Sequence, residues 1–65
     1  MIHTTILTEN GVTKGIAIDR VLESVNKMID EEKIIQGNII EYRTDISTEH
    51  IFDEYEATVT MSWYD

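Results

Sequence analysis

The chain of 65 residues carries 13 acidic and 5 basic side chains, a formal net charge of −8, and no cysteine. This length predicts a single domain over residues 1–65, and the lack of cysteine excludes disulfides and thiolate metal sites. Because so short a chain buries only about 60% of its unfolded surface, self-association is the remaining route to a stable core.

The acidic balance argues against direct contact with nucleic acid or with a membrane, because both reward Lys and Arg. It favours a partner with a basic surface, or serves solubility alone. No apolar run approaches the ~20 residues of a membrane span, and the first ten residues do not form a signal peptide. We therefore expect a cytoplasmic location in a bacterial host cell.

The first predicted element is a strand over residues 2–8. The segment is rich in Ile and Thr, which suit a pleated surface. Its alternation places Ile2, Thr4 and Ile6 on one face of the strand. Asn10-Gly11 then predicts a turn.

A helix is predicted in the middle of the chain. Apolar residues recur there at steps of three and four, which lines one side of a helix: Ile18, Val21, Leu22, Val25, Met28 and Ile29. The helix is expected to start between Thr13 and Ala17, with Thr13 as the candidate N-cap. Gly37-Asn38 predicts the next turn.

Two strands follow, over residues 39–46 and 55–64. The second alternates clearly, with Tyr55, Ala57, Val59, Met61 and Trp63 on one face and Glu56, Thr58, Thr60, Ser62 and Tyr64 on the other. A long acidic loop is expected over residues 47–54. The fold class is therefore α+β, with strand-helix-strand-strand order and one amphipathic helix on one face of a three-stranded sheet.

Catalysis has little support in this sequence. None of the three serines lies in a strand-to-helix elbow, and Gly11 and Gly15 lack the other residues of a phosphate-binding loop. Residues 45–56 have the oxygen spacing of a calcium loop, but His50 stands where the sharp turn needs glycine. We predict that the chain is not an enzyme and has no cofactor and no metal.

Oligomerisation has more support. A small sheet leaves two unpaired edges, which invite another copy of the chain. One helix cannot also cover every apolar residue near the loops, such as Ile34 and Ile35. We predict a homodimer or larger assembly whose interface includes aromatic residues: Tyr42, Phe52, Trp63 and Tyr64.

The C-terminal half resembles the short acidic sporulation-associated proteins of spore-forming bacteria and their phage-borne relatives. The resemblance lies in Ile39-Ile40-Glu41-Tyr42-Arg43 and in the strand from Tyr55 to Met61-Ser62-Trp63-Tyr64. It implies a bacterial or phage origin and an accessory role, and it transfers no functional residue.

The strand-helix-strand-strand order also looks like dodecin, a small flavin-storing protein that forms hollow spheres. In that family a Trp early in the second strand stacks on flavin, and a Gln on the last strand contacts it. The corresponding residues here are Glu41 and Glu56. The resemblance implies a similar assembly, while these two departures argue against flavin binding.

Three functional hypotheses follow. The first is a homo-oligomeric inhibitor, a phage or bacterial anti-defence protein that occupies a basic surface of a host defence or nucleic-acid-handling protein. Its candidate binding residues are Glu41, Asp45, Glu49, Asp53, Glu54, Glu56 and Tyr64, with the helix-end run of residues 30–32.

The second hypothesis is a dodecin-like oligomer that sequesters a flavin or nucleotide, with Tyr42, Trp63 or Tyr64 stacking and Arg43 or Lys14 pairing a phosphate. The third is a structural or regulatory assembly piece without a small ligand.

Overall fold

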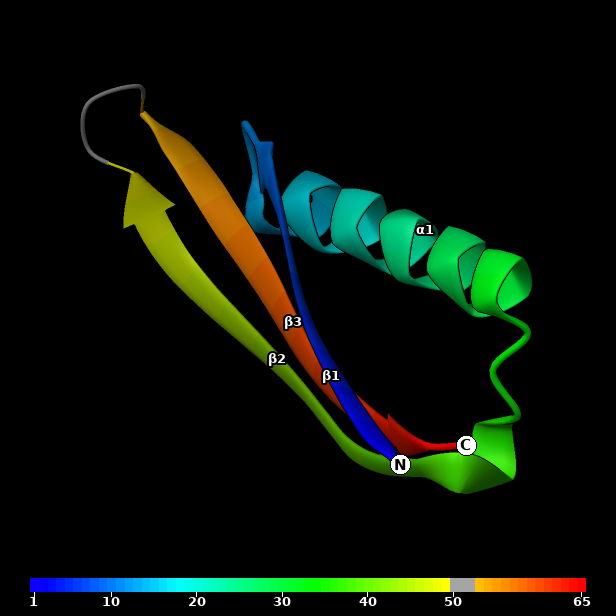
Figure 1. Ribbon diagram of the computed structural model, residues 1–65. Helices are drawn as coiled ribbons and strands as arrows, with labels where there is room; N and C mark the ends of the chain where they lie inside the picture. Colours follow the sequence, from blue (N-terminus) through cyan, green and yellow to red (C-terminus); the bar gives the residue numbers. More distant parts are fainter. Residues whose placement is uncertain (50–52) are drawn as a thin grey trace.

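The chain forms three strands and one long helix, and the computed structural model describes residues 1–49 and 53–65. The elements are β1 (Ile2–Gly11), α1 (Lys14–Glu32), the 3-10 turn η1 (Gln36–Asn38), β2 (Ile39–Glu49) and β3 (Glu54–Tyr64). The sheet is antiparallel with the order β1-β3-β2, and α1 packs on one face of it, against β1 and β3 (Figure 1). The predicted α+β fold and its element order are confirmed.

The core is a two-layer contact between α1 and the central strand. The fully buried side chains come from one stripe of the helix and one face of β3: Ala17, Val21, Val25, Ala57, Val59 and Met61. Both periodicities in the sequence, about 3.6 for the helix and 2 for the strand, thus converge on this contact. Half-buried apolar residues surround it, including Leu7 of β1 and Trp63 of β3.

Local interactions define both ends of α1. Thr13 is the N-cap, and its Oγ1 accepts a hydrogen bond from the Ile16 backbone N–H at 3.1 Å. At the other end, Lys33 adopts the left-handed conformation, with φ 55°. The Ile34 N–H donates to the Ile29 carbonyl at 3.0 Å and the Lys33 N–H to the Asp30 carbonyl, the pattern of a Schellman motif.

Two predicted connections differ from the structure. The strand β1 continues past Thr8 to Gly11, so Asn10-Gly11 ends the strand instead of forming the turn. The acidic loop expected over 47–54 is wrong in extent, because β2 runs to Glu49 and β3 begins at Glu54. Gly37-Asn38 does lie in a turn, as part of η1.

The molecule exposes more surface than a compact chain of its size. Its accessible area is 4700 Å², against about 4250 Å² expected for a folded monomer of 7.5 kDa. Its radius of gyration is 12.7 Å, against about 11 Å expected for 65 residues. The difference reflects the long hairpin of β2 and β3, which extends beyond the helix (Figure 1).

Within residues 1–49 and 53–65, the length and apolar character that a membrane crossing requires are not met by any helix.

Candidate functional site

The open face, which we define as the face of the sheet turned away from α1, joins side chains from all three strands. Its centre is a group of hydroxyl residues on β1 and β3. Thr4 Oγ1 lies 2.9 Å from Ser62 Oγ, and Thr8 Oγ1 lies 3.2 Å from Thr58 Oγ1. These hydrogen bonds link neighbouring strands across the face and give it a polar centre.

Carboxylates gather on the open face from both strands of the hairpin. The register places Glu41 opposite Ser62 and Asp45 opposite Thr58, so these acids share the face of the hydroxyl group. Glu54 and Glu56 alternate with the buried residues of β3 and lie on the same face. The four acids Glu41, Asp45, Glu54 and Glu56 are hereafter the acidic group.

Only one basic side chain, Arg43, accompanies the acidic group among the described residues of the open face. Its Nε donates to Asp45 Oδ2 at 3.1 Å, and both side chains are more than half exposed. An exposed pair of this kind contributes little to stability. The face therefore keeps a clear excess of negative charge.

An apolar corner lies at the start of β1, at the Glu41 end of the open face. Ile2 pairs with Tyr64 across the strands, and Ile6 lies two rows further along the same face. All three side chains are more than half exposed. A large aromatic residue beside polar and charged groups is typical of a protein-binding surface.

The structure places five of the seven predicted binding residues on the open face, spread along the sheet from Glu54 at one end of β3 to Tyr64 at the other: Glu41, Asp45, Glu54, Glu56 and Tyr64. Asp53 is exposed in the turn before β3, with φ 54°. The backbone of Glu49 pairs with Glu54 at the end of β2. The helix-end run of residues 30–32 belongs to α1, in the other layer of the fold, and is separate from the acidic group (Figure 1).

The predicted interface aromatics occupy two faces. Tyr42 and Trp63 lie on the helix side of the sheet, opposite Met61 and Ile39 respectively, whereas Tyr64 lies on the open face. Trp63 is half-buried and stacks on His3, with 5.4 Å between ring centroids. Phe52 lies outside the described residues, and the interface itself remains a prediction.

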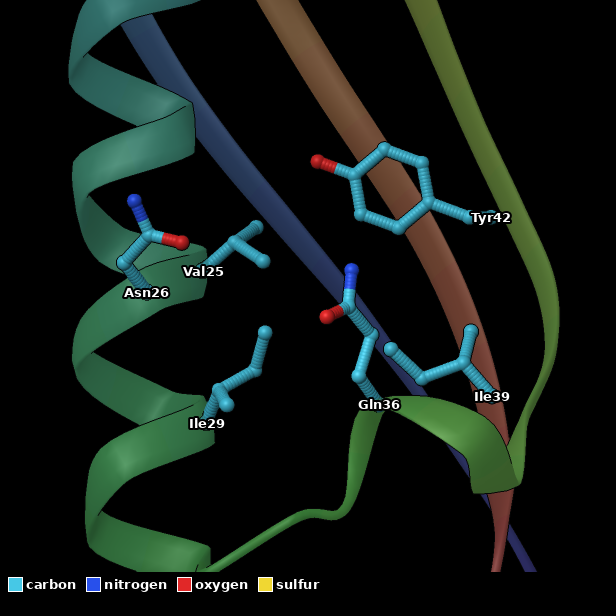
Figure 2. Close-up of a pocket in the computed structure, with 6 residues that line it drawn as sticks. All are labelled: Val25, Asn26, Ile29, Gln36, Ile39 and Tyr42. Atoms are coloured by element: carbon cyan, nitrogen blue, oxygen red, sulfur yellow. The ribbon is translucent and has the colours of Figure 1, made fainter.

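A groove between α1 and β2 is absent from the sequence-based predictions. Its volume is about 580 Å³, and its lining residues are Val25, Asn26, Ile29, Gln36, Ile39 and Tyr42. Figure 2 shows the Tyr42 ring extending from β2 toward α1. The groove exists because α1 packs over β1 and β3, which leaves the helix side of β2 accessible. The sequence signal for this groove was the alternation that places Tyr42 and Ile46 on the helix side of β2, a strand that α1 does not cover.

The first and last positions of the calcium-loop spacing lie in strands. Asp45 and Ser47 lie within β2, and Glu56 lies within β3. Over residues 1–49 and 53–65 no three His, Asp or Glu side chains converge well enough to hold a metal ion. His50, which stands where a calcium loop needs glycine, lies outside the described residues.

Among the residues that the structure describes, the Asp65 carboxyl has a shifted pKa. The hydrogen bond from the His3 imidazole, at 2.7 Å, lowers the pKa of the Asp65 carboxyl, and the positive charges of His3 and the N-terminal amine add to this effect. The Asp65 side chain is mostly exposed, so the contact joins the two chain ends and forms no enclosed reactive site.

Comparisons with known proteins do not assign this chain to a family. Neither the protein-family models, nor the curated proteins, nor the solved structures include a match to it.

Proposed function

We propose that this chain is a small acidic, non-enzymatic binding protein that acts as a homo-oligomer and inhibits a bacterial host protein. Its target is a defence or nucleic-acid-handling protein, and its open face occupies a basic surface there. The observation that supports this proposal is that the acidic group, which comes from two strands, shares one face of the sheet, and that an exposed aromatic corner lies at the Glu41 end of this face.

Electrostatics explains how such a face acts. Carboxylates spaced along a sheet attract Lys and Arg side chains that otherwise hold phosphates, and they speed the encounter with such a surface. Tyr64 and Ile2 then provide apolar contact area next to the charged region, where affinity is less sensitive to salt. The bacterial or phage setting rests on the resemblance to the acidic sporulation-associated proteins.

A charge-matched pair of variants tests the role of the open face. One variant neutralises the acidic group by Glu41→Gln, Asp45→Asn, Glu54→Gln and Glu56→Gln. The control neutralises four exposed acids of α1 by Asp19→Asn, Asp30→Asn, Glu31→Gln and Glu32→Gln. Each removes four of the eight net negative charges.

The immobilised wild type, the open-face variant and the helix control are each exposed to bacterial lysate and eluted with increasing salt. We expect the wild type and the helix control to retain the same host protein at low salt and release it as salt rises. The open-face variant should not retain it. Equal retention by all three proteins, or retention that does not change with salt, would contradict the proposal.

A second candidate function is the sequestration of a small ligand in the groove. Its volume falls within the range of ligand sites, and Tyr42 offers a ring for stacking. Arg43 lies on the open face, while the Lys14 ammonium lies 5.8 Å from the Tyr55 ring centroid, and neither lines the groove. The lining carries no charged side chain, which favours an uncharged ligand over a flavin phosphate or nucleotide.

Native mass spectrometry after gentle purification separates the two functions. Sequestration requires a bound mass that disappears in the variant Tyr42→Ala, and a clean apo mass in the wild type argues against it. The inhibitor proposal requires no bound mass.

A further inference from the structure

The edge strand β2 carries a sequence that is complementary to itself. In the sheet order β1-β3-β2, β2 has a neighbouring strand on one side only within the described chain. Its outer backbone N–H and C=O groups are a template for another strand. The strand is 11 residues long and contains no proline, and no other labelled element lies along its outer side in Figure 1.

We propose that two copies of the chain pair antiparallel through β2, about a two-fold axis that passes by Thr44, to form one continuous six-stranded sheet. This proposal defines the interface of the homo-oligomer. It rests on the proposed function only for the self-association of the chain. It does not depend on the identity of any host protein.

The open-face side of this pairing brings opposite charges together. A two-fold axis at Thr44 places Arg43 opposite Asp45 of the partner subunit, and the same contact occurs twice by symmetry. Opposite charges directly across two strands stabilise the pairing, and like charges destabilise it. Within one chain Arg43 Nε already lies 3.1 Å from Asp45 Oδ2, so the dimer joins two such pairs into an alternating cluster of four charges.

The helix side of the pairing brings apolar groups together. Tyr42 lies opposite Ile46 of the partner subunit, a pairing of an aromatic with a β-branched side chain that favours sheets. In the single chain Tyr42 is 46% and Ile46 is 37% exposed, although both lie on the face that carries the core. A partner strand would shield both side chains, which α1 does not cover.

The two neighbouring registers do not place opposite charges across the axis. With the axis at Arg43, Glu41 would lie opposite Asp45 of the partner subunit, which places two negative charges together. With the axis at Asp45, Arg43 would lie opposite Ser47 of the partner subunit and the charge pair would be lost. The register at Thr44 therefore satisfies charge on one face and apolar packing on the other.

Charge reversal tests the interface in the full chain. Sedimentation velocity at micromolar concentration should give a dimer for the wild type. Arg43→Asp and Asp45→Arg should each raise the dimer dissociation constant by about tenfold or more, because each places two like-charge pairs across the axis. The double variant Arg43→Asp/Asp45→Arg should restore the dimer. The control Ile6→Arg, on the other edge strand, should leave it unchanged.

Cysteine cross-linking gives a second readout that does not depend on charge. The chain has no native cysteine, so Thr44→Cys introduces a single thiol. Opposite residues at a two-fold axis have Cα atoms about 4.5–5.5 Å apart, within the reach of a disulfide. The matched control is Thr48→Cys on the same face of β2, whose two copies would lie about 27 Å apart in this register. Oxidation should cross-link Thr44→Cys and leave Thr48→Cys monomeric on a denaturing gel.

Each result has one meaning once circular dichroism shows that the variants are folded. A dimer that survives both single reversals, that dissociates with Ile6→Arg alone, or that cross-links equally at both cysteine positions overturns this interface and leaves the proposed oligomeric function intact. A wild type that sediments as a monomer overturns the interface and the oligomeric part of the function together. The lysate experiment tests the open face separately from both.

Discussion

Gly11 lies so close to Ala17 that a Cβ built on Gly11 would stand 2.5 Å from the Ala17 backbone nitrogen. The end of β1 thus packs directly against the first turn of α1. The φ of Gly11 is not in the left-handed region, so glycine is required here for the close approach of the backbone and not for its conformation.

Gly11→Ala should therefore lower the free energy of unfolding by about 1–3 kcal/mol, because the backbone of α1 must shift. The matched control is Gly15→Ala, where an added Cβ meets nothing closer than 3.9 Å. That substitution should raise stability by about 0.5–1 kcal/mol, since Ala favours the helix over Gly. Urea denaturation at one fixed protein concentration measures both, and equal effects of the two substitutions would refute the close-approach argument.

Lys33 ends α1 in a conformation that glycine adopts more easily. Lys33→Gly should raise the free energy of unfolding by about 0.5–1 kcal/mol while the Schellman hydrogen bonds remain. Lys27→Gly, at an exposed position inside the same helix, should lower it by about 1 kcal/mol. Thermal denaturation followed by circular dichroism should show midpoints that move in opposite directions, and a loss of stability in Lys33→Gly would contradict the expectation.

Met61 is the largest fully buried side chain and lies in the middle of β3. Met61→Ala should cost about 2–5 kcal/mol, because it leaves a cavity in the small group of buried apolar side chains that the structure describes. Val12→Ala, at a position that is mostly exposed, should change stability by no more than about 0.5 kcal/mol. Urea denaturation of both variants checks this. A stable, cooperative Met61→Ala variant would show that the core lies elsewhere.

The contact between His3 and Asp65 makes a small part of the stability depend on pH. Because the His3 hydrogen bond lowers the folded pKa of Asp65 below its ordinary value, the contact contributes its full stability above that ordinary value, and the contribution is lost as pH falls through the folded pKa. His3→Ala should move the NMR titration midpoint of the Asp65 carboxyl upward, toward its ordinary value. In concentrated urea the two proteins should titrate alike. An unchanged midpoint in the folded variant would show that His3 is not the cause.

Local patterns were sufficient to predict the elements and their faces. The alternation from Tyr55 to Tyr64 and the three-to-four spacing from Ile18 to Ile29 predicted most of the side chains that form the core, but not Ala17. The ends were harder to place, because residues 47–49 are polar and carry no apolar alternation to mark them as part of β2. The left-handed Lys33 was also hidden, since glycine or asparagine usually marks that position.

The composition of the open face depends on non-local pairing. Glu41 and Glu56 lie on one face only because β2 and β3 pair in the observed register. The alternation of each strand predicts its two faces but not which face of one strand joins which face of the next. The groove beside Tyr42 likewise depends on which two strands α1 covers.

The order of strands in the sheet affects how the chain folds. Both β1 and β2 pair with β3 and not with each other, and β3 is synthesised after them. During translation β1 and α1 are therefore made before their central neighbour β3. The pairing of β1 with β3 must then form between segments that are separated by most of the chain. Such distant pairing slows folding and leaves bare strands exposed to other nascent chains in the meantime. The high negative charge makes the incomplete chains repel one another until β3 has been made and has paired.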